Sequence, residues 1–94
     1  MNTISEYRDL YPSAIIVNCY NTAHIFSSPS TAKKFFSVAY YGTEGSESER
    51  YATILDKLSV GWRTISDDED IVTEDRELLT KVNGHKIHGK IKKQ

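Results

Sequence analysis

The sequence predicts an α+β fold in which an antiparallel sheet of two hairpins plus one further strand is covered by two or three helices. Three observations lead to this expectation. Apolar residues recur at helical spacing between residues 46 and 62. Runs that favour strands flank turn signals near residue 21 and at residues 83–84. The length of 94 residues suits one domain, which we expect to span residues 1–94.

The helix expected from residue 46 is the clearest element. Its apolar positions share one face, which we expect to pack on the sheet: Tyr51, Ile54, Leu55 and Leu58. Ser46 and Glu49 have the spacing of a capping box, and Lys57 suits the negative end of the helix dipole. Gly61 is expected to end the helix, because glycine readily adopts the left-handed conformation that follows many helices.

The N-terminal part predicts a short helix and then a hairpin. Thr3 and Glu6 form a second capping-box pattern, for a helix that ends near Leu10. Residues 14–20 and 23–26 favour strands, with a turn at Asn21-Thr22. In that register one face of the hairpin should meet the core: Ile15, Val17, Cys19, His24 and Phe26.

The middle of the chain predicts another helix, from Ser28-Pro29 to Gly42. Its helically spaced apolar positions are Ala32, Phe35, Phe36, Ala39 and Tyr40. A strand over residues 35–41 is the competing interpretation, because phenylalanine, valine and tyrosine also favour sheets. Beyond the helix at residue 46 we expect a strand at residues 62–66, a solvated loop at 67–70 and a short return strand at 71–73.

The C-terminal part contains the strongest hairpin signal, the dipeptide Asn83-Gly84. A two-residue turn there would pair Val82 with His85. It would place four apolar residues on one face: Leu78, Val82, Ile87 and Ile91. A helix from Ser66 or Thr73 toward Asn83-Gly84 is the alternative, so strand and helix both stay open for residues 66–82.

Composition narrows the classes of partner. The formal net charge is −1, but it combines an acidic stretch at residues 67–77 with a basic end. A single cysteine excludes an intramolecular disulfide framework and suits a reducing compartment. The longest apolar run, residues 14–17, is too short to span a bilayer, and the first residues lack the pattern of a secretory signal. We therefore expect a cytoplasmic protein with no membrane partner.

No segment carries a specific catalytic or metal-binding motif. Cys19 and His24 would supply two ligands where a structural zinc site needs four, and Cys19 looks like an inert core thiol. We expect no metal, no cofactor and no enzymatic activity. The best enzyme alternative is a small toxin-like ribonuclease, whose acid, base and phosphate contacts would come from the sheet: Tyr20, His85, Lys86, His88 and Lys90.

The remaining class is a non-enzymatic binding protein, either an inhibitor or an accessory factor of the kind that mobile elements encode. The expected partner is a protein, including one with a basic nucleic-acid-binding surface, and a homodimer stays open. The residues expected to bind it are the acidic loop with two aromatic anchors: Asp67, Asp68, Glu69, Asp70, Tyr40 and Tyr41. Nucleic acid is the alternative partner, through the basic hairpin and tail: Lys81, Lys86, Lys90, Lys92 and Lys93. Whether Tyr40 and Tyr41 belong to core or surface stays open.

Overall fold

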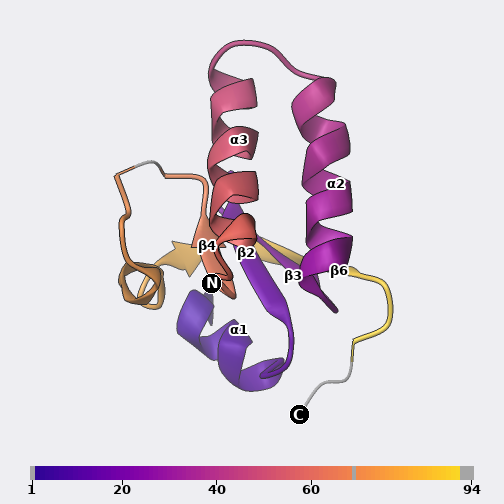
Figure 1. Cartoon of the computed structure of the whole chain (residues 1–94). Coiled ribbons are helices and arrows are strands. Elements are labelled where there is room, and N and C mark those ends of the chain that lie inside the picture. The colour runs from indigo at the N-terminus through magenta and orange to yellow at the C-terminus, as the bar shows by residue number, and fades with distance from the viewer. Residues whose placement is uncertain (1, 69, 92–94) are drawn as a thin grey trace.

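The α+β class is confirmed by a computed structural model, which describes residues 2–68 and 70–91 (Figure 1). The described residues form three α-helices: α1 (Ile4–Leu10), α2 (Pro29–Tyr41) and α3 (Ser46–Ser59). They also form a 3₁₀ turn, η1 (Glu74–Glu77). The strands are β1 (Asn2–Thr3), β2 (Ile15–Cys19), β3 (Thr22–Phe26), β4 (Thr64–Ser66), β5 (Lys81–Val82) and β6 (Gly84–His88).

The main sheet is mixed, so the expected antiparallel arrangement is wrong. Its strand order is β4-β2-β3-β6. Strands β2 and β3 are antiparallel, whereas β4 runs parallel to β2 and β6 runs parallel to β3. Strands β1 and β5 form a separate antiparallel pair. Strand β6 therefore lies at one edge of the main sheet and β4 at the other.

The first hairpin has the predicted face, with its turn one residue earlier than predicted. Tyr20 and Asn21 form the turn, with φ angles of 51° and 60°, and Cys19 lies opposite Thr22. Two consecutive positive φ angles fit a type I′ turn, which matches the twist of the flanking strands. Four of the five residues predicted on the core face are buried together, namely Ile15, Val17, Cys19 and Phe26, and His24 lies on the same side but is only partly buried.

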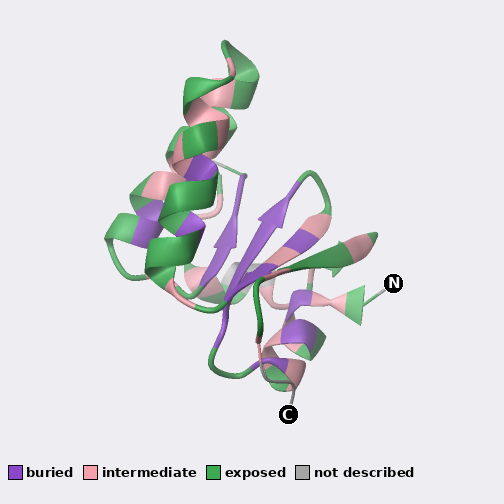
Figure 2. Cartoon of the chain, turned by 90° about the vertical axis from the view of Figure 1, so that its right-hand side faces the viewer, coloured by how far each residue is buried: buried purple, intermediate pink, exposed green. Residues whose placement is uncertain are grey.

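The sheet carries a hydrophobic core on each face (Figure 2). Helices α2 and α3 cover one face side by side, and α1 covers the other (Figure 1). All five residues of β2 are buried, because the strand is central and packed on both faces. The second core joins α1 to alternate positions of the hairpin and to Val82. The prediction covered one face of the hairpin, whereas in the structure both faces meet a core.

The helix boundaries follow local sequence signals with one exception. The capping box of Thr3 and Glu6 is confirmed, as is the N-cap of Ser28, whose hydroxyl accepts from the Thr31 N–H at 3.2 Å. The capping box expected at Ser46 is wrong. Gly45 takes the N-cap position at φ 69°, so Ser46 already lies inside the helix. Positive φ is readily adopted by glycine, which explains the displaced start.

The inner face of α3 is confirmed. Ile54 and Leu58 are buried in the first core, and Tyr51 and Leu55 pack against it. Gly61 follows the helix at φ 96°, as predicted for the residue after a C-cap. On α2 the structure selects helix over the competing strand and buries Ala32 and Phe36.

The predicted C-terminal hairpin does not form, so this prediction is wrong. One residue, Asn83, separates β5 from β6, and the two strands join different sheets. Val82 pairs with Asn2, and His85 pairs with Ala23, so each strand finds a partner far away in the sequence. The Asn83 N–H donates to the Asn21 carbonyl at 2.7 Å, which fastens the crossing point to the first turn.

The segment before β5 is neither a strand nor a long helix. The return strand expected at residues 71–73 does not form, and the competing helix is reduced to the single turn η1 after Thr73. Leu78 and Ile91 still pack against the second core, whereas Ile87 is exposed. None of the helices in the described ranges is long and apolar enough to cross a membrane.

Candidate functional site

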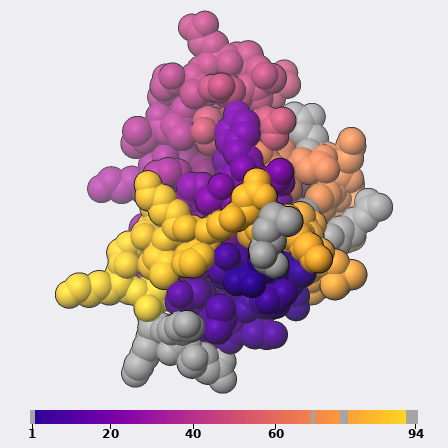
Figure 3. Space-filling view, turned by 180° about the vertical axis from the view of Figure 1, so that it is seen from behind, coloured from indigo at the N-terminus to yellow at the C-terminus, as the bar shows by residue number. Residues whose placement is uncertain are grey.

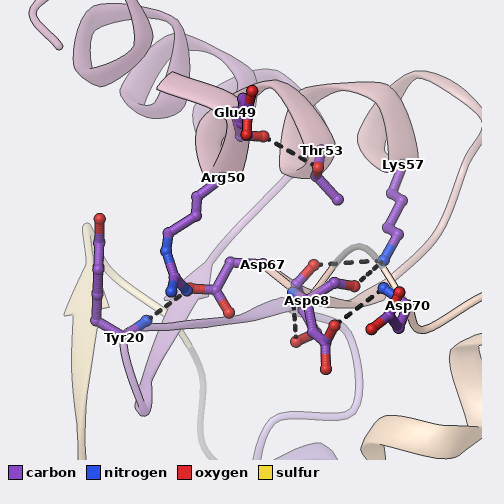
Figure 4. Close-up of polar contacts among 9 residues, drawn as sticks. Tyr20, Glu49, Arg50, Thr53, Lys57, Asp67, Asp68 and Asp70 are labelled. Carbon is purple, nitrogen blue, oxygen red and sulfur yellow. Dashed lines mark hydrogen bonds and ion pairs between the residues drawn. The ribbon is translucent and has the colours of Figure 1, made fainter. Parts of the chain in front are cut away.

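The acidic segment after β4 is not a uniformly solvated loop, because its first carboxylate is buried. Asp67 is 8% exposed. Its Oδ2 accepts hydrogen bonds from Arg50 Nη1 at 2.9 Å and from the Tyr20 N–H at 3.0 Å (Figure 4). The Arg50 guanidinium also lies 4.9 Å from the centre of the Tyr20 ring. Asp67 therefore connects α3 to the β2–β3 turn, and the expectation of a solvated docking charge is corrected for this residue.

The next carboxylates remain on the surface. Asp68 Oδ1 accepts from the Asp70 N–H at 2.9 Å, and both residues are exposed. Lys57 Nζ donates to the backbone carbonyls of Asp68, at 3.3 Å, and Ser66, at 3.4 Å (Figure 4). Asp67, Asp68 and Asp70 line an open polar groove of about 540 Å³ that Arg50 also reaches. Glu69 lies outside the described residues.

The two tyrosines lie at the C-terminal end of α2. Their ring centroids are 5.4 Å apart in an edge-to-face arrangement. Tyr41 is 84% exposed, whereas Tyr40 is half-buried. The far end of α2 and the segment that leaves β4 lie on different sides of the molecule (Figure 1). The acidic and aromatic residues singled out from the sequence thus do not form one continuous surface.

The lysines expected to share a hairpin face are separated by the corrected topology. Lys81 belongs to β5 and Lys86 to β6, which lie in different sheets. Lys90 follows β6, and all three side chains are exposed. Lys92 and Lys93 lie outside the described residues. The basic hairpin face on which the nucleic-acid alternative depended does not form.

The titratable groups of the sheet are not arranged as the sequence alternatives required. Cys19 is buried, and burial together with the nearby Asp67 raises its pKa to about 12, so it is a thiol at neutral pH. His24 lies opposite Val17 rather than Cys19. Within the described ranges, no three residues among His, Cys, Asp and Glu are grouped so that they could hold a metal ion.

The histidines of β6 lie on opposite faces of the sheet. His85 Nδ1 is 3.2 Å from the Tyr7 hydroxyl on the α1 side. His88 Nε2 is 2.9 Å from His24 Nδ1, beside the aromatic residues of the α2 side. The Tyr20 ring lies beside Arg50 instead. The residues named for a ribonuclease therefore do not converge on one point.

An exposed apolar stripe on α2 was missed by sequence reasoning. Phe35, Val38 and Tyr41 follow one another at intervals of three and are 37%, 71% and 84% exposed. Phe35 was predicted only as one of the helically spaced apolar positions of this helix, and Val38 was given no role. The signal was available, since spacing of three marks neighbours on a helix surface, but it was masked by the stronger inward pattern.

A shallow groove of about 420 Å³ runs beside this stripe, between α2 and β6. It is lined mainly by apolar and aromatic side chains: Phe26, Thr31, Lys34, Phe35, Val38, Ala39 and His88. The His88 ring stacks on Phe26 with centroids 4.3 Å apart and lies 4.6 Å from Phe35. Strand β6 and residues 89–91 lie on the outside of the molecule, seen from behind in Figure 3. We call the stripe and this groove together the α2–β6 surface.

The α2–β6 surface combines an uncharged floor with a cationic rim, which consists of Lys34, a lining residue of the groove, and Lys86, on the same face of β6 as His88. Burial, together with His88 and Lys86, lowers the pKa of His24 to about 4, and burial and Lys86 also lower the pKa of His88. Both imidazoles are therefore neutral near pH 7. Helix α2 and residues 84–91, all of them described, contain no carboxylate side chain and four lysines: Lys33, Lys34, Lys86 and Lys90.

Comparisons with protein-family models, with curated protein sequences and with solved structures found no match to this chain.

Proposed function

We propose that this protein acts by binding another protein through the α2–β6 surface. The observation that carries the proposal is the exposed stripe of Phe35, Val38 and Tyr41 beside an apolar groove. Single exposed apolar residues are common on protein surfaces, but a continuous patch is typical of an interaction site. Its composition also fits, because aromatic side chains are enriched and carboxylates depleted at the centres of protein interfaces.

The energetic argument concerns water that these side chains contact in the free protein. Removing a large apolar side chain from water contributes about 1.5–3 kcal/mol. Val38 and Tyr41 are the most exposed members of the stripe and have the most surface left to bury. A partner that covers them, together with the half-exposed ring of Phe35, gains the central apolar contact on which interface affinity usually depends.

The proposed activity is binding without catalysis, as expected for an inhibitor or an accessory factor in the cytoplasm. The separation of His85 from His88 and the protonated state of Cys19 support this proposal. Asp68 and Asp70 stay as a second, charged contact for a partner with a basic patch. Asp67 is no longer included, since Arg50 and the Tyr20 N–H already engage its carboxylate.

A pull-down with a charge placed in the stripe tests the proposal. The tagged protein and its Val38→Asp variant are exposed to nuclease-treated lysate of the cells that encode it, and retained proteins are identified. Val60→Asp is the matched control, because Val60 is also highly exposed but follows α3. A discrete protein retained by wild type and Val60→Asp, and lost from Val38→Asp, supports the proposal. Nucleic acid recovered without nuclease, and lost as salt rises, favours the alternative instead.

A further inference from the structure

We propose that the ligand of the α2–β6 surface is an extended, acidic peptide segment of the partner that adds a strand to the outer edge of β6. Carboxylates of this segment face the lysines of the rim, and one large apolar side chain enters the groove. This inference rests on the proposed function and names the chemistry of its ligand.

The first argument is the position of β6. It pairs with β3 along one side, and no strand in the described part of the chain pairs with its other side. An edge strand presents backbone N–H and C=O groups that a further strand can engage, and extended peptides use such edges in strand addition. The five residues of β6, Gly84–His88, are long enough for a short peptide strand.

The second argument is the shared wall between edge and groove. His88 belongs to β6 and also lines the groove. A strand added to β6 would lie about 4.8 Å beyond it, and alternate side chains of that strand would point toward the α2 side of the sheet. One of them would meet Phe35 and Val38 at the groove. Grooves of a few hundred Å³ are of the size that takes an aromatic or large aliphatic side chain.

The third argument is charge. Lys34 lines the groove, and Lys86, two positions before His88, lies on the same face of β6. With four lysines and no carboxylate on α2 and residues 84–91, a basic peptide is repelled and an acidic one attracted. The same lysines disfavour pairing of β6 with β6 of a second copy, because like charges would then face each other across the junction. The charge pattern therefore selects an acidic partner segment over self-association.

Selection from a random peptide library tests this inference. Phage-displayed twelve-residue peptides are selected on the immobilised full chain, then synthesised with a fluorophore and titrated by anisotropy. The expected peptides carry carboxylates around one aromatic or large aliphatic residue. Their Kd should rise at least tenfold for Val38→Asp and about fivefold for Lys86→Glu. Val60→Asp and Lys81→Glu are the matched controls, since Val60 follows α3 and Lys81 lies in β5, and both should bind as wild type.

Backbone methylation tests the strand geometry separately. In an added strand, alternate amides of the peptide face β6, so N-methylation of one alternating set should weaken binding at least tenfold and methylation of the other set should not. Circular dichroism checks that each protein variant is folded. If Val38→Asp does not fold, Lys34→Glu, at an exposed position on the rim, replaces it with the same expected direction.

The outcomes separate this inference from the function on which it rests. Three results would overturn the inference. The selected peptides could be basic, or they could bind the Val38→Asp and Lys86→Glu variants with the same Kd as the wild-type protein. They could also keep their affinity when any one of their amides is methylated. A library that yields no binder also overturns the inference. So does a dimer of this chain, detected by analytical ultracentrifugation, that dissociates in the Val38→Asp variant. If the pull-down still depends on Val38 in those cases, the proposed function stands and the partner binds as a folded surface. Loss of both results removes both proposals.

Discussion

Arg50 and Asp67 form a hydrogen-bonded ion pair of 2.9 Å that ties the first half of α3 to the end of β4. Asp67 Oδ2 also accepts the N–H of Tyr20, so one carboxylate joins the helix, the strand and the first turn. The Arg50 side chain is about half exposed to solvent, and this exposure reduces the electrostatic contribution of the ion pair to stability. The hydrogen bonds of the buried Asp67 carboxylate link three elements of the fold, which gives this residue a structural role.

Replacing Asp67 with alanine should therefore reduce stability. We expect a loss of about 1–2 kcal/mol in the free energy of unfolding, because a hydrogen-bonded charge is removed and the Tyr20 N–H loses its acceptor. Urea denaturation measures it. Asp70→Ala is the control and should change stability by less than about 0.5 kcal/mol, since its side chain is exposed. Equal effects of the two substitutions would contradict the role given to Asp67.

The adjacent phenylalanines of α2 should differ sharply. Phe36 is fully buried in the first core, and Phe36→Ala should cost about 3–5 kcal/mol through lost burial and the cavity that remains. Phe35 is partly exposed on the α2–β6 surface, so Phe35→Ala should cost about 1 kcal/mol. Thermal or urea unfolding of both variants checks this difference. A larger loss at Phe35 would show that α2 is rotated relative to the structure.

The two capping-box patterns should respond differently to substitution. Thr3→Ala should destabilise the protein by about 1 kcal/mol, because the Thr3 hydroxyl accepts from the Glu6 N–H. Ser46→Ala should have an effect below about 0.5 kcal/mol, since Gly45 occupies the N-cap and α3 has no side-chain cap. Denaturant midpoints of both variants measure the contrast. If Ser46→Ala lost as much stability as Thr3→Ala, Ser46 would act as the N-cap of α3 and the structure would be contradicted at this point.

Acid should destabilise the fold through His24. Burial lowers the pKa of His24 from 6.5 to about 4, with further contributions from His88 and Lys86. Between pH 6.5 and about pH 4, His24 is protonated in the unfolded chain but neutral in the folded chain. The contribution of His24 to the free energy of unfolding therefore decreases as pH falls through this range, and it is constant below about pH 4. The folded state also lowers the pKa of His88, which acts in the same direction.

The measurement is the urea midpoint of wild type and His24→Gln between pH 7.5 and pH 5. Wild type should lose more stability than the variant over this range, because the glutamine does not titrate. An NMR titration of the His24 ring gives the folded-state pKa directly. A folded-state pKa of 6.5 or above for His24 would contradict the buried, neutral state assigned to it. The same pH dependence of stability in wild type and His24→Gln would contradict it too.

Local signals predicted most of the helices and the first hairpin. The Thr3–Glu6 pair, the Ser28-Pro29 start and the inner stripe of α3 act within one or two turns, so neighbouring residues decide them. The placement of β5 and β6 was not predictable in this way. Asn83-Gly84 is a strong local turn signal, but the strands beside it gain more from pairing with distant β1 and β3.

The site was less predictable than the fold. Asp67 lies in a run of carboxylates that suggested a solvated loop, and its ion-pair partner Arg50 is 17 residues away. Adjacent Phe35 and Phe36 both fitted an apolar helix, and the sequence did not indicate which faced the core. The groove depends on β6 lying beside α2, which follows from the parallel pairing of β6 with β3. Such a pairing has no short-range signal.

The most direct test of the central claim is retention of a partner protein by wild type and by Val38→Asp, measured by quantitative mass spectrometry after nuclease treatment. The account predicts that one partner is retained by wild type and by the equally folded Val60→Asp control, and falls at least tenfold with Val38→Asp. Equal retention by all three proteins would contradict the assignment of the α2–β6 surface as the binding site.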